Sequence, residues 1–270
     1  MNPNYFCGYD IGALVMKSWV PKPPGHISCA SNYDAPVFYY PVDNTSNQNI
    51  HGGSTDIIPN IIDATYELKK MGCKAVFTSC GYFGHYQKRI SDESIMPAYL
   101  SSICLVPFIL NLIGKKRKVA IICYNKERLT QSLFEACGVD SEMRERCYVY
   151  DIVGQPELGK IITDCGEYDI SKAREEVVSV AVEAVNEHSD IGAFLLECTD
   201  LPPHSYAIQE ATNMPVFDAT IMIKFVQTLV CGGGVNYSRR LSAVYLFYEF
   251  VRLSIMLRSL ILLRLFEKTT

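Results

Sequence analysis

Apolar residues recur along the chain both as short continuous runs and as longer stretches with helical spacing. The runs, which are rich in β-branched and aromatic residues, predict strands at residues 6–16, 35–42, 73–79, 119–124, 147–153, 191–196 and 214–217. The helical spacing predicts helices at residues 55–71, 99–113, 127–137, 171–188 and 205–212, with Thr55 and Ser171 as N-caps. Continuously apolar strands that alternate with helices are typical of parallel sheets covered on both faces. The pattern therefore predicts an α/β fold.

Two cysteines stand where predicted strands leave the core. Cys80 ends the run in "VFTSCGYFGH", and Cys198 ends the run in "GAFLLECTDLPP". Ligands of parallel α/β sheets bind at the carboxyl ends of the strands. A helix that starts beside the sulfur favours the thiolate, and Gly81, Thr199 and Asp200 suit such a start. Both cysteines are therefore candidates for an activated thiol.

The surroundings of the two cysteines repeat at an offset of 118 residues. Five positions recur identically: Ala75, Cys80, Met96, Pro97 and Ile103 return as Ala193, Cys198, Met214, Pro215 and Ile221. One interpretation is that two ordinary strand–helix units end in similar residues. The other is that two lobes face each other across a cleft and each contributes one cysteine. The second interpretation predicts one lobe from residues 1–113 plus 218–235 and another from residues 114–217. A hydrophobic C-terminal extension of unknown role follows at residues 236–270.

Opposed thiols suit the inversion of a carbon stereocentre. One group must remove a proton from one face of the carbon, and another must deliver a proton to the opposite face. A thiolate and a thiol can fill both roles and exchange them in the reverse reaction. A cysteine with an ordinary pKa of about 8.5 is mostly protonated at neutral pH, so its surroundings must favour the anion.

Composition narrows the class of protein further. The net charge is −4, and the scattered Lys and Arg residues form no basic face for nucleic acid. The N-terminal residues lack the pattern of a secretory signal, so we expect a cytoplasmic protein. The cysteine count of 11 is odd, and neither Cys-x-x-Cys pairs nor histidines at zinc spacing occur. We therefore expect neither a disulfide framework nor a metal site.

The segments "TSCG" and "ECTDLPP" resemble the two cysteine motifs of the aspartate/glutamate/hydantoin racemase superfamily. The N-terminal "VPKPPGHISCASNYDAPVFYYPV" is similar to a subfamily pattern, and the resemblance covers about residues 8–230. It implies two similar α/β lobes whose parallel sheets face each other across a central cleft. It also implies racemisation or epimerisation of an acidic amino acid or related carboxylate, without pyridoxal phosphate or another cofactor.

The resemblance implies a role for residues that match the motifs. Cys80 and Cys198 become the acid/base pair at a carbon next to a carboxylate. Hydroxyl groups and backbone amides at the two junctions become candidates for binding the substrate: Thr78, Ser79, Gly81, Ser101, Ser102 and Thr199. Asp200 is a candidate for tuning a thiol or capping a helix. His204, near the second cysteine, and Asp10, in the first strand, are further candidates for reaching the cleft.

The sequence departs from the family patterns at several positions, so the resemblance does not identify the substrate. His26 stands where the subfamily pattern has Asp, and Asp200 stands where glutamate racemases have His. His51 lies in a glycine-rich turn and is interpreted as structural. The alternatives are a hydantoin-racemase-like enzyme, a maleate-isomerase-like enzyme with one nucleophilic cysteine, and a non-catalytic small-anion-binding protein on the same scaffold.

The extension at residues 236–270 is strongly apolar, but charged residues such as Glu249 and Arg258 interrupt it. No apolar stretch in it reaches the roughly 18 residues of a membrane-spanning helix. A membrane surface, a partner protein and a second protomer of a homodimer all remain open as its contacts.

Overall fold

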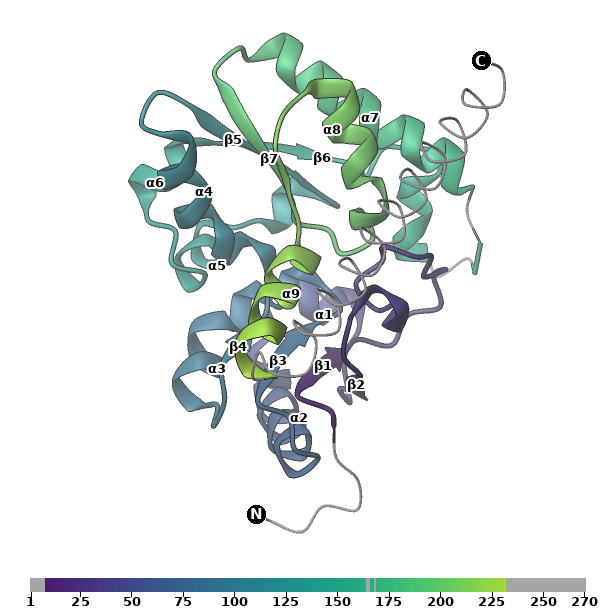
Figure 1. Ribbon diagram of the computed structural model, residues 1–270, viewed down its shortest axis with the longest axis vertical. Helices are drawn as coiled ribbons and strands as arrows, with labels where there is room; N and C mark the ends of the chain where they lie inside the picture. The colour runs from purple at the N-terminus through teal and green to yellow at the C-terminus, as the bar shows by residue number, and fades with distance from the viewer. Residues whose placement is uncertain (1–7, 164–165, 168, 232–270) are drawn as a thin grey trace, which may run out of the picture. The chain divides into compact units, whose positions relative to one another are not determined.

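The described chain is built on two four-stranded parallel sheets (Figure 1). The computed structural model describes residues 8–163, 166–167 and 169–231. The first sheet has the strand order β2-β1-β3-β4, and the second has the order β6-β5-β7-β8. The strands are β1 Ile11–Val15, β2 Val37–Pro41, β3 Ala75–Thr78, β4 Ala98–Tyr99, β5 Lys118–Cys123, β6 Cys147–Asp151, β7 Ile191–Leu196 and β8 Val216–Phe217. The predicted α/β architecture with two similar halves is confirmed.

Helices connect the strands. The α-helices are α1 Asn47–His51, α2 Ile58–Lys70, α3 Gln87–Glu93, α4 Val106–Ile113, α5 Gln131–Ala136, α6 Ser141–Glu145, α7 Ile170–Glu187, α8 Ser205–Thr212 and α9 Ala219–Val230. The 3-10 turns are η1 Ala30–Asn32, η2 Thr55–Ile57, η3 Gly81–Tyr86, η4 Ser102–Leu105, η5 Lys126–Arg128, η6 Leu158–Thr163 and η7 Pro202–His204. The described residues up to Val230 form one compact unit. The bounds of the two lobes stay a prediction, and the extension at residues 236–270 lies outside the described residues.

Burial explains why the sequences of the central strands are unbroken apolar runs. Every residue of β7 is buried, as is every residue of β5 after Lys118. On the covering helix α7, Ala173, Val177 and Ala181 are buried at a spacing of four residues. A helix with that spacing packs one stripe against the sheet and leaves its other face polar.

The two halves repeat the same backbone pairing beside the cysteines. The Val76 amide donates to the Pro97 carbonyl at 2.9 Å, and the Phe194 amide donates to the Pro215 carbonyl at 2.8 Å. Donor and acceptor each shift by the predicted 118 residues, since 194 − 76 and 215 − 97 are equal. The internal repeat inferred from the sequence is therefore present in the sheets.

Two helix starts differ from the prediction. Asp169, rather than Ser171, caps α7, because its carboxylate accepts from the backbone amides of both Ser171 and Lys172. Ser54, rather than Thr55, caps the turn that leads into α2. In both cases the side chain just before the first turn reaches the unpaired amides, as N-caps generally do.

The sequence pattern also missed some elements. The segment predicted as a helix from residue 99 begins with the end of β4, and its α-helical part starts only at Val106. Helices α1 and α6 have five residues each, which is too short for a helical period to appear. No helix within the ranges described above is long and apolar enough to cross a membrane.

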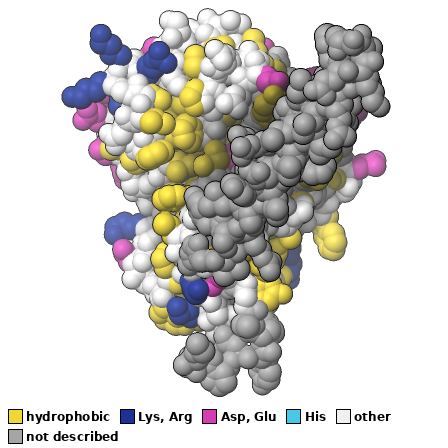
Figure 2. Space-filling model, in the orientation of Figure 1, with side chains coloured by type: hydrophobic (Ala, Val, Ile, Leu, Met, Phe, Trp, Pro, Cys, Tyr) yellow, Lys and Arg dark blue, Asp and Glu magenta, His cyan; other side chains and the backbone are white. Residues whose placement is uncertain are grey.

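Hydrophobic side chains gather on the face that carries α4 and α9 (Figure 2). Phe108 and Leu112 of α4 are exposed, as are Ile221, Phe225 and Leu229 of α9. Both helices therefore bury only one side against the rest of the described chain.

Asp218 fixes the start of α9. One carboxylate oxygen accepts from the Thr220 amide at 2.8 Å, the Thr220 hydroxyl at 2.6 Å and the Ile221 amide at 3.3 Å. The other accepts from the Ser205 hydroxyl at 2.6 Å. This buried carboxylate thus ties the beginning of α9 to the beginning of α8.

We expect Asp218→Ala to lower the free energy of unfolding by about 2 kcal/mol, the upper end of the range for an N-cap. The reason is that four donors lose their shared acceptor together. The exposed N-cap Asp140 of α6 provides the control, and Asp140→Ala should cost about 0.5 kcal/mol. Urea unfolding of the full chain measures both, and equal losses would contradict the anchoring role.

Candidate active site

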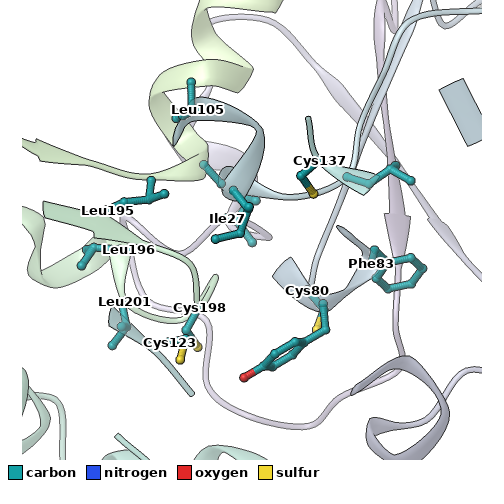
Figure 3. Packing of buried hydrophobic residues seen from close by; sticks show 14 of the residues in the cluster. Ile27, Cys80, Phe83, Leu105, Cys123, Cys137, Leu195, Leu196, Cys198 and Leu201 are labelled. Carbon is teal, nitrogen blue, oxygen red and sulfur yellow. The ribbon is translucent and has the colours of Figure 1, made fainter. Parts of the chain in front are cut away.

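The carboxyl ends of β3 and β7 lead to one pocket, of about 560 Å³ when the space at its mouth is included. Both Cys80 and Cys198 line it. Figure 3 shows the two thiols among the buried side chains, on segments that belong to different halves of the chain. The cysteines are 8% and 7% exposed. Each thiol is therefore buried from bulk solvent but in contact with the pocket.

Several aromatic rings lie near Cys80. Its sulfur lies 3.8 Å from Nε2 of His51. The His51 ring packs against Tyr82 at a centroid distance of 4.3 Å and against Tyr124 at 6.3 Å. Burial, helped by the charge of Arg128, lowers the pKa of His51 to about 4. His51 is consequently neutral at pH 7.

Cys198 belongs instead to a series of polar side chains linked by hydrogen bonds. The thiol donates to Oδ2 of Asp200 at 3.6 Å, and Oδ1 of Asp200 lies 3.0 Å from Nε2 of His26. Nδ1 of His26 accepts the backbone amide of Ser28 at 2.9 Å. Because Nδ1 is an acceptor, a neutral His26 carries its proton on Nε2 and donates it to Asp200.

Asp200 keeps its negative charge in this setting. Burial alone would raise the pKa of its carboxyl, but the hydrogen bond and charge of His26, together with Lys22, lower that pKa overall. Burial raises the pKa of Cys198 well above its usual range, and the Asp200 carboxylate raises it further. The Cys198 thiol is therefore held in its protonated form.

Glu197, directly before Cys198 in the chain, is a third titratable group that lines the pocket. It is fully buried, and neither carboxyl oxygen has a hydrogen-bond partner in the described part of the chain. Burial raises the pKa of Glu197 to about 8, so the group is mostly neutral at pH 7. Burial and the charge that Glu197 can acquire both raise the pKa of Cys80.

The backbone at Gly81 lies against Glu197. A Cβ atom at Gly81 would collide with both the carboxyl and the carbonyl group of Glu197. Only glycine permits this close approach between the first turn after β3 and the end of β7.

The pocket brings together six of the residues singled out in the sequence: Ser79, Cys80, Gly81, Cys198, Thr199 and Asp200. The two hydroxyls among them are engaged with the backbone. The Ser79 hydroxyl accepts the Met16 amide at 2.9 Å, and the Thr199 hydroxyl donates to the Ser79 carbonyl at 2.7 Å. They hold the junctions in place.

Three further candidates, Thr78, Ser101 and Ser102, line a smaller neighbouring cavity of about 180 Å³. The Thr78 hydroxyl donates to the Leu100 carbonyl at 2.7 Å, and the Ser102 hydroxyl donates to the Leu196 carbonyl at 3.0 Å. The structure does not bring these side chains to the pocket of the thiols.

His204 and Asp10 also lie away from the pocket. His204 is fully buried in η7, and burial lowers its pKa to about 4. Asp10 precedes β1, at the amino end of the sheet, and its carboxylate pairs with Lys74 at 2.6 Å. Ligand pockets of parallel sheets form at the other end of the strands, which explains the placement of Asp10.

Twelve lining residues were not assigned to the site from the sequence, among them His26, His51, Tyr82, Tyr124 and Glu197. A charged residue at the end of an apolar run was a visible signal for Glu197. No comparable signal marked His51, which is the last residue of the short helix α1.

Solved structures in the racemase superfamily have this fold. An arylmalonate decarboxylase matches with a TM-score of 0.53 and 17% identity, over 83% of this chain and 93% of its own. An allantoin racemase from Klebsiella pneumoniae matches with a TM-score of 0.55 and 14% identity, over 83% and 89%. A glutamate racemase from Bacillus anthracis matches with a TM-score of 0.51 and 14% identity, over 82% of each chain. These matches confirm the expected superfamily fold.

Sequence comparison points to a narrower group, although no family model matches the chain. A dimethylsulfoniopropionate lyase from Durusdinium sp. clade D is 31% identical over 219 residues, which are 78% of this chain and 72% of that protein. Two dimethylsulfoniopropionate lyases from Emiliania huxleyi, numbers 7 and 3, are 28% and 26% identical over 79% and 78% of this chain. The matches span 65% and 57% of those two longer proteins. The chain belongs to the family of the dimethylsulfoniopropionate lyases.

Proposed function

We propose that this protein is a lyase that releases dimethyl sulfide from dimethylsulfoniopropionate or a similar sulfonium carboxylate. Family membership supports the substrate class. The observation that carries the proposal is one pocket with two buried thiols of different character. The substrate also fits the chemistry expected of such thiols, since it carries a proton on the carbon next to its carboxylate.

The reaction is a β-elimination. A base removes the proton next to the carboxylate, and the electron pair of that C–H bond forms a double bond to the next carbon. The bond from that carbon to sulfur breaks, and its electron pair stays on sulfur. The products are acrylate, neutral dimethyl sulfide and the protonated base. Because the sulfide leaves as a neutral molecule, one base suffices.

We assign the base to Cys80. Burial raises the pKa of this thiol, so its thiolate needs a positive charge nearby. The sulfonium group of the substrate brings that charge into the pocket. His51, 3.8 Å from the sulfur, can pass the thiol proton on to solvent water, and it does not retain the proton because burial lowers its pKa to about 4. The thiolate therefore forms together with the bound substrate.

Cys198 has a different role in this scheme. Its thiol donates to the Asp200 carboxylate and stays protonated. Lys22 also lines the pocket, and its positive charge can pair with the carboxylate of the substrate. The Ser28 hydroxyl lines it too and has no hydrogen-bond partner among the described residues. These groups would direct the acidic carbon between the two sulfurs.

A second candidate is the racemisation or epimerisation of a small acidic amino acid, as the two-cysteine pattern predicts. The protonated thiol of Cys198 on the same pocket as Cys80 favours it. In that reaction Cys80 removes the proton, and Cys198 returns one to the opposite face. The two reactions differ in whether the next carbon carries a group that can leave.

Cys80→Ser should lower kcat for dimethyl sulfide release by about 10²–10⁴-fold, the usual contribution of a general base. Cys198→Ser should lower it by about tenfold, because a hydroxyl still donates to Asp200. The control is Cys147→Ser, a buried thiol of β6 that donates to the Met143 carbonyl, and it should leave kcat unchanged. Headspace gas chromatography of the released sulfide measures all three.

Full activity of Cys80→Ser would rule out its role as the base. To separate the second candidate, single enantiomers of aspartate and glutamate are incubated in D₂O and followed by NMR. Exchange of the α-proton without any release of dimethyl sulfide would replace the lyase by a racemase. Neither reaction would leave the non-catalytic alternative.

The raised pKa of Glu197, about 8, predicts a pH limit. Above that pH the carboxyl becomes a buried anion beside the thiols and opposes the Cys80 thiolate. The wild-type rate should therefore fall between pH 7 and pH 9 by up to about tenfold relative to Glu197→Gln, since about nine tenths of the carboxyl is then ionised.

Stability provides an independent readout of the same group. The folded carboxyl keeps its proton up to about pH 8, whereas an unperturbed glutamate loses it near 4.5. The wild type should thus lose unfolding free energy as pH rises through this window, and Glu197→Gln should not. Identical pH profiles of rate and stability in the two proteins would show that Glu197 is ionised throughout.

A further inference from the structure

Three aromatic rings form one wall of the pocket. His51, Tyr82 and Tyr124 all line it, and His51 lies between the two tyrosines at centroid distances of 4.3 and 6.3 Å. The three come from distant parts of the chain, namely α1, η3 and the residue after β5. The fold therefore assembles a continuous aromatic surface beside Cys80.

The polar ends of the two tyrosines are occupied elsewhere. The Tyr82 hydroxyl donates to the Asn125 carbonyl at 2.9 Å and accepts the Asn125 amide at 2.8 Å. The Tyr124 hydroxyl donates to the Gly159 carbonyl at 3.2 Å. With both hydroxyls bound to the backbone, the rings supply mainly their π surfaces to a ligand.

This wall does not repel a cation. Burial lowers the pKa of His51 to about 4, so the imidazole is uncharged at neutral pH. Arg128 of η5, whose side chain is exposed to solvent, and His85 also lower the pKa of His51. The faces of aromatic rings attract cations, and the attraction strengthens when the site is shielded from water.

Polar groups from another segment also line the pocket. They are Lys22, His26 and the Ser28 hydroxyl, which has no hydrogen-bond partner among the described residues, and none of the three rings belongs to that segment. A ligand that carries a carboxylate at one end and a cation at the other matches this division. Aspartate, which carries two carboxylates and an ammonium group that bears no methyl groups, does not match it as well.

We propose that His51, Tyr82 and Tyr124 form a subsite for an onium group, a positively charged sulfur or nitrogen that carries methyl groups. The assignment of this group to the dimethylsulfonium end of the substrate rests on the lyase function proposed above. Cation–π attraction then holds the leaving group beside Cys80, while the segment with Lys22 holds the carboxylate.

The test uses two ligands of the same shape that cannot react by elimination of dimethyl sulfide. In 3-(trimethylammonio)propanoate the terminal group is a quaternary ammonium ion, and in 4,4-dimethylpentanoate a neutral carbon replaces the nitrogen. Isothermal titration calorimetry with the full chain should give a Kd at least about tenfold lower for the ammonium compound. Equal affinity, or tighter binding of the neutral compound, would overturn the subsite.

Matched variants locate the effect on a ring. Tyr124→Phe keeps the ring and loses only the bond to the Gly159 carbonyl, so it should keep the preference for the ammonium compound. Tyr124→Leu removes the ring and should reduce that preference by about threefold or more. Circular dichroism checks that both variants fold. An undiminished preference in a folded Tyr124→Leu protein, with Tyr82→Leu behaving alike, would contradict the proposal.

Failure of the subsite and failure of the lyase function give different results. If dimethyl sulfide is released but the two ligands bind equally, the subsite is wrong and the lyase function stands. If no sulfide is released but the ammonium compound is preferred, the onium subsite stands and the natural ligand is a different cationic carboxylate.

Discussion

The close approach of Gly81 to Glu197 is the contact on which the site depends. Each residue is the immediate neighbour of a cysteine that lines the pocket, Gly81 of Cys80 and Glu197 of Cys198. Because a Cβ atom at Gly81 would collide with Glu197, the two halves approach each other here too closely for any side chain at residue 81. The hydroxyl of Thr199 adds a hydrogen bond across the same junction. The separation of the two thiols is therefore a property of the backbone and does not depend on flexible side chains.

The internal repeat covers the sheets but not the chemistry around the thiols. The strand order and the backbone bonds beside the cysteines recur in both halves. The neighbours of the sulfurs do not, since Cys80 faces His51 while Cys198 donates to Asp200. Both His26 and His51 come from the chain between β1 and β3, so one half supplies both imidazoles. A symmetric scaffold thereby acquires an asymmetric site, which suits an elimination with one base better than an inversion with two.

Strand ends could be predicted from the sequence, whereas contacts made by loops could not. Cys80 and Cys198 were recognised because an apolar run that stops on a thiol marks the carboxyl end of a buried strand. The sequence did not reveal whether the hydroxyls of Thr78 and Ser102 bind a ligand or the backbone. Buried carbonyl groups at a strand-to-helix junction need hydrogen-bond donors. Both hydroxyls donate to such carbonyls and are therefore not directed at a ligand. The position of His51 depends on where α1 packs, and that long-range contact leaves no local pattern.

Tyr82 has a consequence for how a ligand reaches the pocket. It belongs to η3, which follows the first sheet's β3, yet its hydroxyl takes both the amide and the carbonyl of Asn125, which follows the second sheet's β5. A hinge rotation of one sheet away from the other would break both bonds, at about 1 kcal/mol each. It would also pull the Tyr82 ring off His51. Separation of the two sheets would therefore also take apart the aromatic surface that we propose for the onium group.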